Sequence, residues 1–154
     1  MSKVSERLSA AGIVLPEPVA PIANYVPFVR AGDLVHISGQ VSLDSSGGIT
    51  GTVGVDVDMA TAVRAARLCG INLLAQMRVA CEGDLDRVTR VVKLGGFVQA
   101  GPDFYDIPVV LNGCSDLMVE VFGDVGRHAR SAVGVYRLPR NFSVEVDAIV
   151  EVAA

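Results

Sequence analysis

Residues 142–152 read FSVEVDAIVEV, and this stretch decides the fold class. Its small apolar residues at positions 144, 146, 148 and 150 alternate with the acidic residues Glu145, Asp147 and Glu151. A period of two is the spacing of a β-strand that buries one face and exposes the other. The sequence therefore predicts that the chain ends in a sheet with one face packed on an apolar layer.

Further strands and two long helices are expected upstream. The predicted strands cover residues 25–30, 34–41, 88–99 and 130–138, with a short additional strand at 49–53. Apolar residues recur three or four positions apart from Met59 onward, which predicts a helix that Asp56 or Asp58 can cap and that ends near Glu82. A second helix is expected at about 108–122. The order β-β-α-β-α-β-β predicts an α+β domain whose helices cover one face of a mixed sheet.

The other face of that sheet must be covered as well, and the composition indicates how. Hydrophobic residues make up 51% of the chain, and the mean hydropathy is +0.46. The most apolar stretch, residues 59–79, is interrupted by Arg64, Arg67 and Arg78, so it does not provide the roughly 20 apolar residues of a membrane span. We therefore expect a soluble oligomer that buries apolar surface between subunits.

Charge and cysteine content argue against several classes of function. The net charge is −4, whereas a surface that follows nucleic-acid phosphates is normally basic. Cys69, Cys81 and Cys114 are an odd number without C-x-x-C spacing, which predicts free thiols in a reducing compartment, the cytoplasm. The two histidines, His36 and His128, are far apart in sequence, so no metal site is expected.

Arg130, within residues 127–131 (RHARS), is the main candidate functional residue. Its guanidinium is permanently charged, and its fork of N–H groups matches a carboxylate. The strands at 130–138 and 142–152 are expected to pair antiparallel across a short turn, which would bring Glu145 toward Arg130. Such a pair has two interpretations. It is either a structural salt bridge, or a pocket in which the arginine holds a substrate carboxylate and the glutamate positions a water or moves a proton.

Several short motifs occur in an order that one protein family shares. They are Tyr25-Val26, Ile37-Ser38-Gly39-Gln40, Asn112, His128-Ala129-Arg130-Ser131, Leu138-Pro139 and Val144-Glu145-Val146-Asp147-Ala148-Ile149. In them the chain resembles the RidA family (reactive intermediate deaminases, YjgF-like), formerly called L-PSP endoribonucleases, and within it a longer subgroup. The resemblance divides the chain into an N-terminal extension, 1–21, and a RidA-like domain, 22–154. A short helix is expected at 2–11, followed by a proline-rich lead-in at 15–21.

This resemblance implies a fold and an activity. The family fold is chorismate-mutase-like, and it forms a homotrimer with ligand clefts between subunits. The implied activity is that of a 2-iminobutanoate/2-iminopropanoate deaminase-type hydrolase, which converts 2-imino and 2-enamino acids to a 2-keto acid and ammonia. It needs no metal or organic cofactor. The implied partners are further copies of the chain and a small carboxylate metabolite.

The resemblance implies roles for individual residues of this chain. Arg130 matches the arginine that clamps the substrate carboxylate, and Glu145 matches the glutamate that holds the attacking water. Tyr25 and Ser38 match residues that line the cleft, and Gly39 contributes backbone there. Asn112 matches the asparagine on the helix.

The matched residues also have purely structural interpretations. These are Tyr25 as a packing aromatic, Ser38 as a donor to neighbouring backbone, Asn112 as a helix cap, and Glu120 as an ion-pair partner that would occupy Arg127 or Arg130. Deaminases of the family usually carry a cysteine two residues after the arginine, where this chain has Ala132. The alternative function is therefore a non-catalytic trimer that binds a carboxylate metabolite as a sensor. A ribonuclease or translation inhibitor is the third hypothesis, which the acidic charge disfavours.

Overall fold

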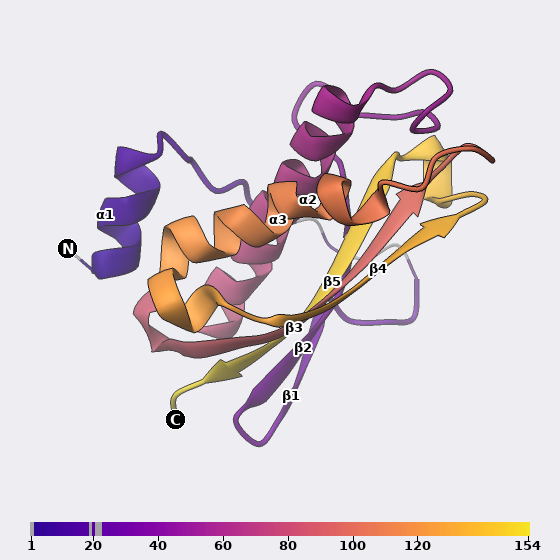
Figure 1. Ribbon diagram of the computed structural model, residues 1–154. Coiled ribbons are helices and arrows are strands. Elements are labelled where there is room, and N and C mark those ends of the chain that lie inside the picture. Colours follow the sequence, from indigo (N-terminus) through magenta and orange to yellow (C-terminus); the bar gives the residue numbers. More distant parts are fainter. Residues whose placement is uncertain (1, 19, 21–22) are drawn as a thin grey trace.

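The computed structural model describes residues 2–18, 20 and 23–154, and it consists of a five-stranded sheet with two long helices across one face (Figure 1). The strands are β1 (Phe28–Ala31), β2 (Leu34–Val41), β3 (Val88–Gln99), β4 (Ala129–Val135) and β5 (Val144–Val152). The helices are α1 (Lys3–Ala10), α2 (Met59–Ala80) and α3 (Ile107–Phe122). The α+β class, the order of the elements after α1 and the one-sided helical layer are as predicted.

The strand order is β1-β2-β5-β3-β4, with β3 and β4 parallel and the other pairs antiparallel. The sheet is mixed, as expected, but the predicted pairing of the last two strands is wrong because β3 lies between them. The physical reason is that α3 crosses over the sheet and returns the chain as a parallel neighbour of β3. Strand β5 then takes a central position, where its buried residues at 144, 146, 148, 150 and 152 face the helices.

Two local predictions have different outcomes. Of the two proposed caps, Asp58 begins α2, and its carboxylate accepts a hydrogen bond from the backbone N–H of Thr61 (2.8 Å). The predicted strand at 49–53 is wrong, since Thr50 and Val53 form only isolated bridges. Gly51 has φ 117°, a conformation that interrupts an extended strand.

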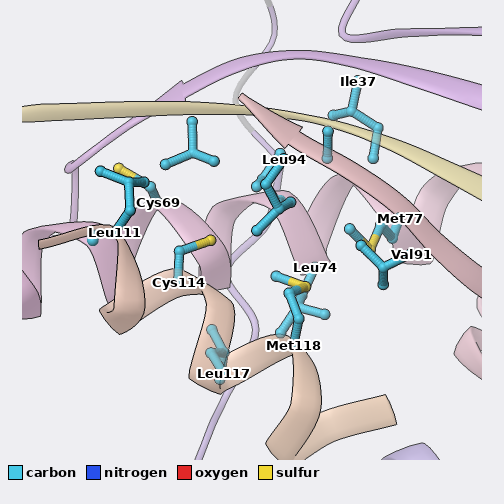
Figure 2. Packing of buried hydrophobic residues seen from close by; sticks show 14 of the residues in the cluster. Ile37, Cys69, Leu74, Met77, Val91, Leu94, Leu111, Cys114, Leu117 and Met118 are labelled. Carbon is cyan, nitrogen blue, oxygen red and sulfur yellow. The ribbon is translucent and has the colours of Figure 1, made fainter. Parts of the chain in front are cut away.

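The hydrophobic core fills the space between the sheet and the helices α2 and α3. Figure 2 shows Leu94 of β3 pointing into this layer, which also contains Leu74 of α2 and Leu111 of α3. Glycines bring the layers close together: a Cβ on Gly96 would collide with the side chain of Leu111. The backbone of β3 therefore lies directly beneath α3, the helix that carries part of the candidate site.

Helix α1 joins the same core. Val4 and Leu8 are buried in the main hydrophobic cluster, and the carboxylate of Asp86 accepts hydrogen bonds from the N–H groups of Lys3 and Val4 (both 2.9 Å). Part of the predicted lead-in, at 19, 21 and 22, lies outside the described residues, so the domain boundary after residue 21 stays a prediction. None of the helices in the described part of the chain is long and apolar enough to cross a membrane.

Candidate functional site

Arg130 lies on the edge strand β4, where it pairs with Leu94 of β3. Because Leu94 is fully buried beneath the helices, Arg130 projects on the helical side of the sheet. Its Nη1 donates hydrogen bonds to Oδ1 of Asn112 (2.9 Å) and to Oγ of Ser115 (3.1 Å). These two acceptors are three residues apart on α3 and therefore share one face of the helix.

The guanidinium of Arg130 is held only by neutral acceptors. Among the described residues, its Nε and Nη2 have no hydrogen-bond partner, and no carboxylate forms an ion pair with it. The structural interpretation in which Glu120 occupies Arg127 or Arg130 is wrong. Glu120 pairs with Arg67 (2.9 Å), and Arg127 pairs with Asp124 (3.6 Å). The Nε/Nη2 edge is thus free to bind a carboxylate through two parallel hydrogen bonds.

Asn112 and Ser115 form the support of this arginine. The side chain of Asn112 accepts from Arg130 instead of capping α3, whose N-cap is Asp106. Ser115 was missed by sequence reasoning, and it also contacts Nε2 of His128 (2.9 Å). The signal that could have found it is the three-residue spacing from Asn112, which places both polar side chains on one helical face.

Glu145 lies on the opposite face of the sheet. Its neighbours Val144 and Val146 are fully buried beneath the helices, so Glu145 points to the uncovered side. The carboxylate lies over Gly39, where a Cβ would overlap it. Burial, and next the charge of Asp147, raise the pKa of Glu145. A raised pKa makes a carboxylate a stronger base, which suits a group that accepts and returns a proton.

Asp147 occupies the same face two residues further along β5. It lies over Gly95, whose missing side chain leaves room for the carboxylate. Burial raises the pKa of Asp147, against opposing effects from the Gly95 N–H and the charge of Lys93. The uncovered face therefore carries two carboxyl groups, Glu145 and Asp147, whose pKa values are both raised.

Ser38 and Tyr25 lie near this face. The Ser38 hydroxyl donates to the carbonyl of Val26 (2.8 Å), and its N–H donates to the carbonyl of Pro27 (2.8 Å). These bonds agree with the structural interpretation of Ser38 as a donor to neighbouring backbone. They hold the segment that carries Tyr25, which is 56% exposed. Beside them is a depression of about 340 Å³, whose lining includes His36, Ser38, Gly39 and Asp147.

The predicted site residues thus form two groups in one chain. Arg130 and Asn112 lie on the helical side of β4, whereas Glu145, Gly39 and Ser38 lie on the uncovered side of β5 and β2. The predicted approach of Glu145 to Arg130 within the chain does not occur, because β3 separates their strands and the side chains face opposite ways.

Two other candidate positions, 114 and 132, lie in or against the hydrophobic core. Cys114 is fully buried, and burial raises the pKa of its thiol to about 12, so it is not an activated nucleophile. Ala132, at the position of the family cysteine, pairs with Gly96 and packs against the core. Across the described ranges, no three His, Cys, Asp or Glu side chains are grouped closely enough to hold a metal ion.

The chain is similar to proteins of one known family. A family model described as "YjgF/chorismate mutase-like, putative endoribonuclease" matches residues 5–151. The chain belongs to this family. The RidA/YjgF relatives include Protein TCP17 of Trypanosoma cruzi, 48% identical over 151 residues, which covers 97% of this chain and 94% of TCP17. The 2-iminobutanoate/2-iminopropanoate deaminase of Dermatophagoides farinae is 28% identical over 137 residues, 88% of each protein.

Solved structures of the RidA/YjgF family share the fold. Atu1372 of Agrobacterium tumefaciens, a protein of unknown function, is 49% identical and superposes with a TM-score of 0.92 over 97% of this chain and 92% of its own. Escherichia coli TdcF, solved with bound serine, is 25% identical with a TM-score of 0.61, covering 88% and 92% of the two chains. The predicted family and its chorismate-mutase-like fold are therefore confirmed.

Proposed function

We propose that this protein hydrolyses reactive 2-imino and 2-enamino acids to 2-keto acids and ammonia, in clefts between the subunits of a homotrimer. The observation that carries the proposal is the hydrogen bonding of the Arg130 guanidinium. Its guanidinium is fixed by two neutral acceptors and has a free Nε/Nη2 edge within the described structure. Such an edge suits a substrate that presents a carboxylate.

The placement of the two groups supports a site shared between copies. Arg130 and Glu145 lie on opposite faces of one sheet, so one chain cannot direct both at the same small molecule. A second copy packed on the uncovered face would bring its own Arg130 edge strand toward Glu145. Oligomers with closed symmetry repeat such a contact at every interface.

The chemistry requires few protein groups. Water adds to the imine carbon, the π pair of the C=N bond moves to nitrogen, and that nitrogen takes up a proton. The amino nitrogen of this adduct then takes up a second proton, the C–N bond breaks, and ammonia leaves with the electron pair of that bond. The hydroxyl oxygen gives up its proton and completes the C=O bond of the keto acid, so one proton is released for the second one taken up. Glu145, whose pKa is raised by burial, accepts the proton of the attacking water and returns it to nitrogen. Arg130 fixes the carboxylate, which holds the imine carbon near that water.

Two relatives support this choice of substrate. The Dermatophagoides farinae relative is a deaminase of 2-iminobutanoate and 2-iminopropanoate. The Escherichia coli relative TdcF was solved with serine, which presents an α-carboxylate beside a nitrogen, as a 2-imino acid does.

The direct test measures turnover. A pyridoxal-phosphate-dependent dehydratase would generate 2-aminoacrylate from serine, and pyruvate release would be followed above the spontaneous rate. We expect acceleration by the wild type, and loss of at least roughly 100-fold in kcat/KM for Arg130→Ala and for Glu145→Gln. Arg127→Ala, which removes an exposed neighbouring arginine, is the matched control and should retain activity. An unchanged rate in Glu145→Gln would remove that residue from the mechanism.

Ala132 in place of the family cysteine favours one second candidate, a trimer that binds a carboxylate metabolite without turning it over. That function predicts binding of 2-oxobutanoate that depends on Arg130, with pyruvate release no faster than the spontaneous rate. The two functions share the binding site and differ in this rate alone, so one pair of measurements separates them.

A complementation experiment tests the shared cleft. Arg130→Ala and Glu145→Gln chains would be unfolded together and refolded as a mixture. If each cleft combines Arg130 of one copy with Glu145 of another, the mixture should regain about one quarter of the wild-type activity. Each variant refolded alone should stay inactive. A mixture as inactive as its components would mean that the two residues act from the same chain.

A further inference from the structure

His128 is bound on both sides of its imidazole ring. Its Nδ1 lies 2.6 Å from the carbonyl oxygen of Gly126, and its Nε2 lies 2.9 Å from Oγ of Ser115. A carbonyl oxygen can only accept a hydrogen bond, so Nδ1 carries a proton, and in the neutral tautomer with this proton Nε2 is an acceptor. Ser115 therefore donates its hydroxyl proton to His128.

The direction of this bond orients the serine toward Arg130. With its proton committed to His128, the Ser115 oxygen turns its lone pairs to other donors, and Nη1 of Arg130 donates to it at 3.1 Å. The result is a directed chain from Arg130 through Ser115 and His128 to the carbonyl of Gly126. Successive hydrogen bonds of this kind polarise and strengthen one another.

The far end of the chain is anchored by packing. Gly126 is buried in the loop after α3, and a Cβ there would collide with the carbonyl oxygen of Met118. The Gly126 backbone thus lies directly against α3, the helix that also carries Ser115. One support of the imidazole, Ser115, thus belongs to α3, and the other, Gly126, is packed against the backbone of α3, which fixes the position of the ring.

We infer that His128 and Ser115 are positioning residues, which orient Arg130 so that its Nε/Nη2 edge faces a ligand carboxylate. The inference rests on the proposed function, because it assigns supports to the same binding site. Asn112 alone would hold one N–H of Nη1 and leave the guanidinium plane free to rotate. The second bond, to Ser115, defines that plane, and His128 keeps the serine oxygen available as the acceptor.

The test is a double-mutant cycle read by calorimetric binding of 2-oxobutanoate to the full-length protein. Ser115→Ala and His128→Phe should each weaken binding by about three- to tenfold. Because His128 acts through the serine, adding His128→Phe to Ser115→Ala should produce no further loss. Ser115→Thr keeps the hydroxyl and should restore binding. Arg127→Ala, whose exposed side chain pairs with Asp124, is the control that should bind normally.

Two further binding measurements distinguish a positioning role from a general loss of structure at the site. The uncharged probe 2-oxobutanamide should lose much less affinity than 2-oxobutanoate in the variants, because only the carboxylate uses the oriented edge. His128→Gln places an acceptor near the former Nε2 and should bind better than His128→Asn, which reproduces only the Nδ1 side.

The possible failures are distinguishable. If Arg130→Ala binds 2-oxobutanoate as tightly as the wild type, the proposed function itself is wrong. If Arg130→Ala loses binding while Ser115→Ala and His128→Phe bind like the wild type, the positioning role is wrong. Additive losses in the double variant, or equal losses for acid and amide, would also overturn it by indicating separate or merely structural effects.

Discussion

Gly113 of α3 lies directly against the backbone of Val63 in α2, and a Cβ on the glycine would collide with the Val63 carbonyl oxygen. Backbone atoms cannot turn aside as a side chain can. We expect Gly113→Ala to push the two helices apart and to lower the free energy of unfolding by about 2 kcal/mol. Since Asn112 adjoins the glycine and holds Arg130, binding of 2-oxobutanoate should weaken as well. Denaturant unfolding and calorimetry measure the two effects.

The control for this variant is Gly70→Ala in α2. A Cβ there meets side-chain atoms of Leu117 and Cys114, which can shift, and alanine favours a helix by about 1 kcal/mol relative to glycine. A smaller loss for Gly70→Ala than for Gly113→Ala is expected. The reverse order would contradict the close approach of the α2 and α3 backbones at Gly113.

Gln99 at the end of β3 is a fully buried amide whose polar atoms are bonded. Its Nε2 donates to Oδ1 of Asn141 (2.6 Å) and to the carbonyl of Gly51 (3.2 Å), while its Oε1 accepts from the N–H of Leu138 (2.8 Å). Gln99→Leu should cost about 2–4 kcal/mol of unfolding free energy, because it leaves buried partners unsatisfied.

The matched substitution is Gln40→Leu. The Gln40 amide makes one local hydrogen bond, to the carbonyl of Ser38 (3.1 Å), so its removal should cost about 1 kcal/mol or less. Urea unfolding of both variants checks the difference. Equal losses would show that the network around Gln99 adds little to stability.

The two carboxyl groups of the uncovered face, Glu145 and Asp147, make stability depend on pH. Their pKa values are raised in the folded protein, so folding favours their protonated forms. That contribution is fully present below the unfolded pKa values and is lost as pH rises through the folded ones. The variant Glu145→Gln/Asp147→Asn lacks both groups and should gain more Tm over the wild type at about pH 8 than at about pH 4. A gain independent of pH would contradict the raised pKa values.

The three cysteines should be inert in the folded protein. Cys69, Cys81 and Cys114 are buried, and burial raises the pKa of each thiol. Because the thiolate is the reactive form, a disulfide reagent such as dithiobisnitrobenzoate should label none of them near neutral pH until denaturant is added. Rapid labelling of one thiol in native protein would show a local opening, and mass spectrometry would identify it.

The local elements were predictable because their signals are local. The alternation in 144–152 identified β5, the spacing from Met59 identified α2, and Asp58 is a side-chain cap that needs only its own helix. Pairing was not predictable in the same way. Whether β4 joins β5 or β3 depends on where the α3 crossover returns the chain, which involves residues far apart in sequence.

For the candidate site, too, the residue types were predictable from the sequence, whereas their arrangement depends on contacts between distant segments. Arg130 and Glu145 were identified from residue chemistry and a family resemblance, but their opposite orientations depend on the strand order. Ser115 carried no recognisable motif of its own, since a helical serine usually faces solvent or bonds its own backbone. Its importance becomes visible only when α3 is placed beside β4.

The arginine support has a consequence for how this protein could diverge. Asn112, Ser115, Gly126, His128 and Arg130 belong to one uninterrupted piece of the chain, residues 112–130, and they bond mainly to one another. The group on the uncovered face is instead assembled from Gly39 and Glu145, which come from distant parts of the sequence. Recombination could therefore exchange segment 112–130, and with it the arginine and its support, while Gly39 and Glu145 stay unaltered.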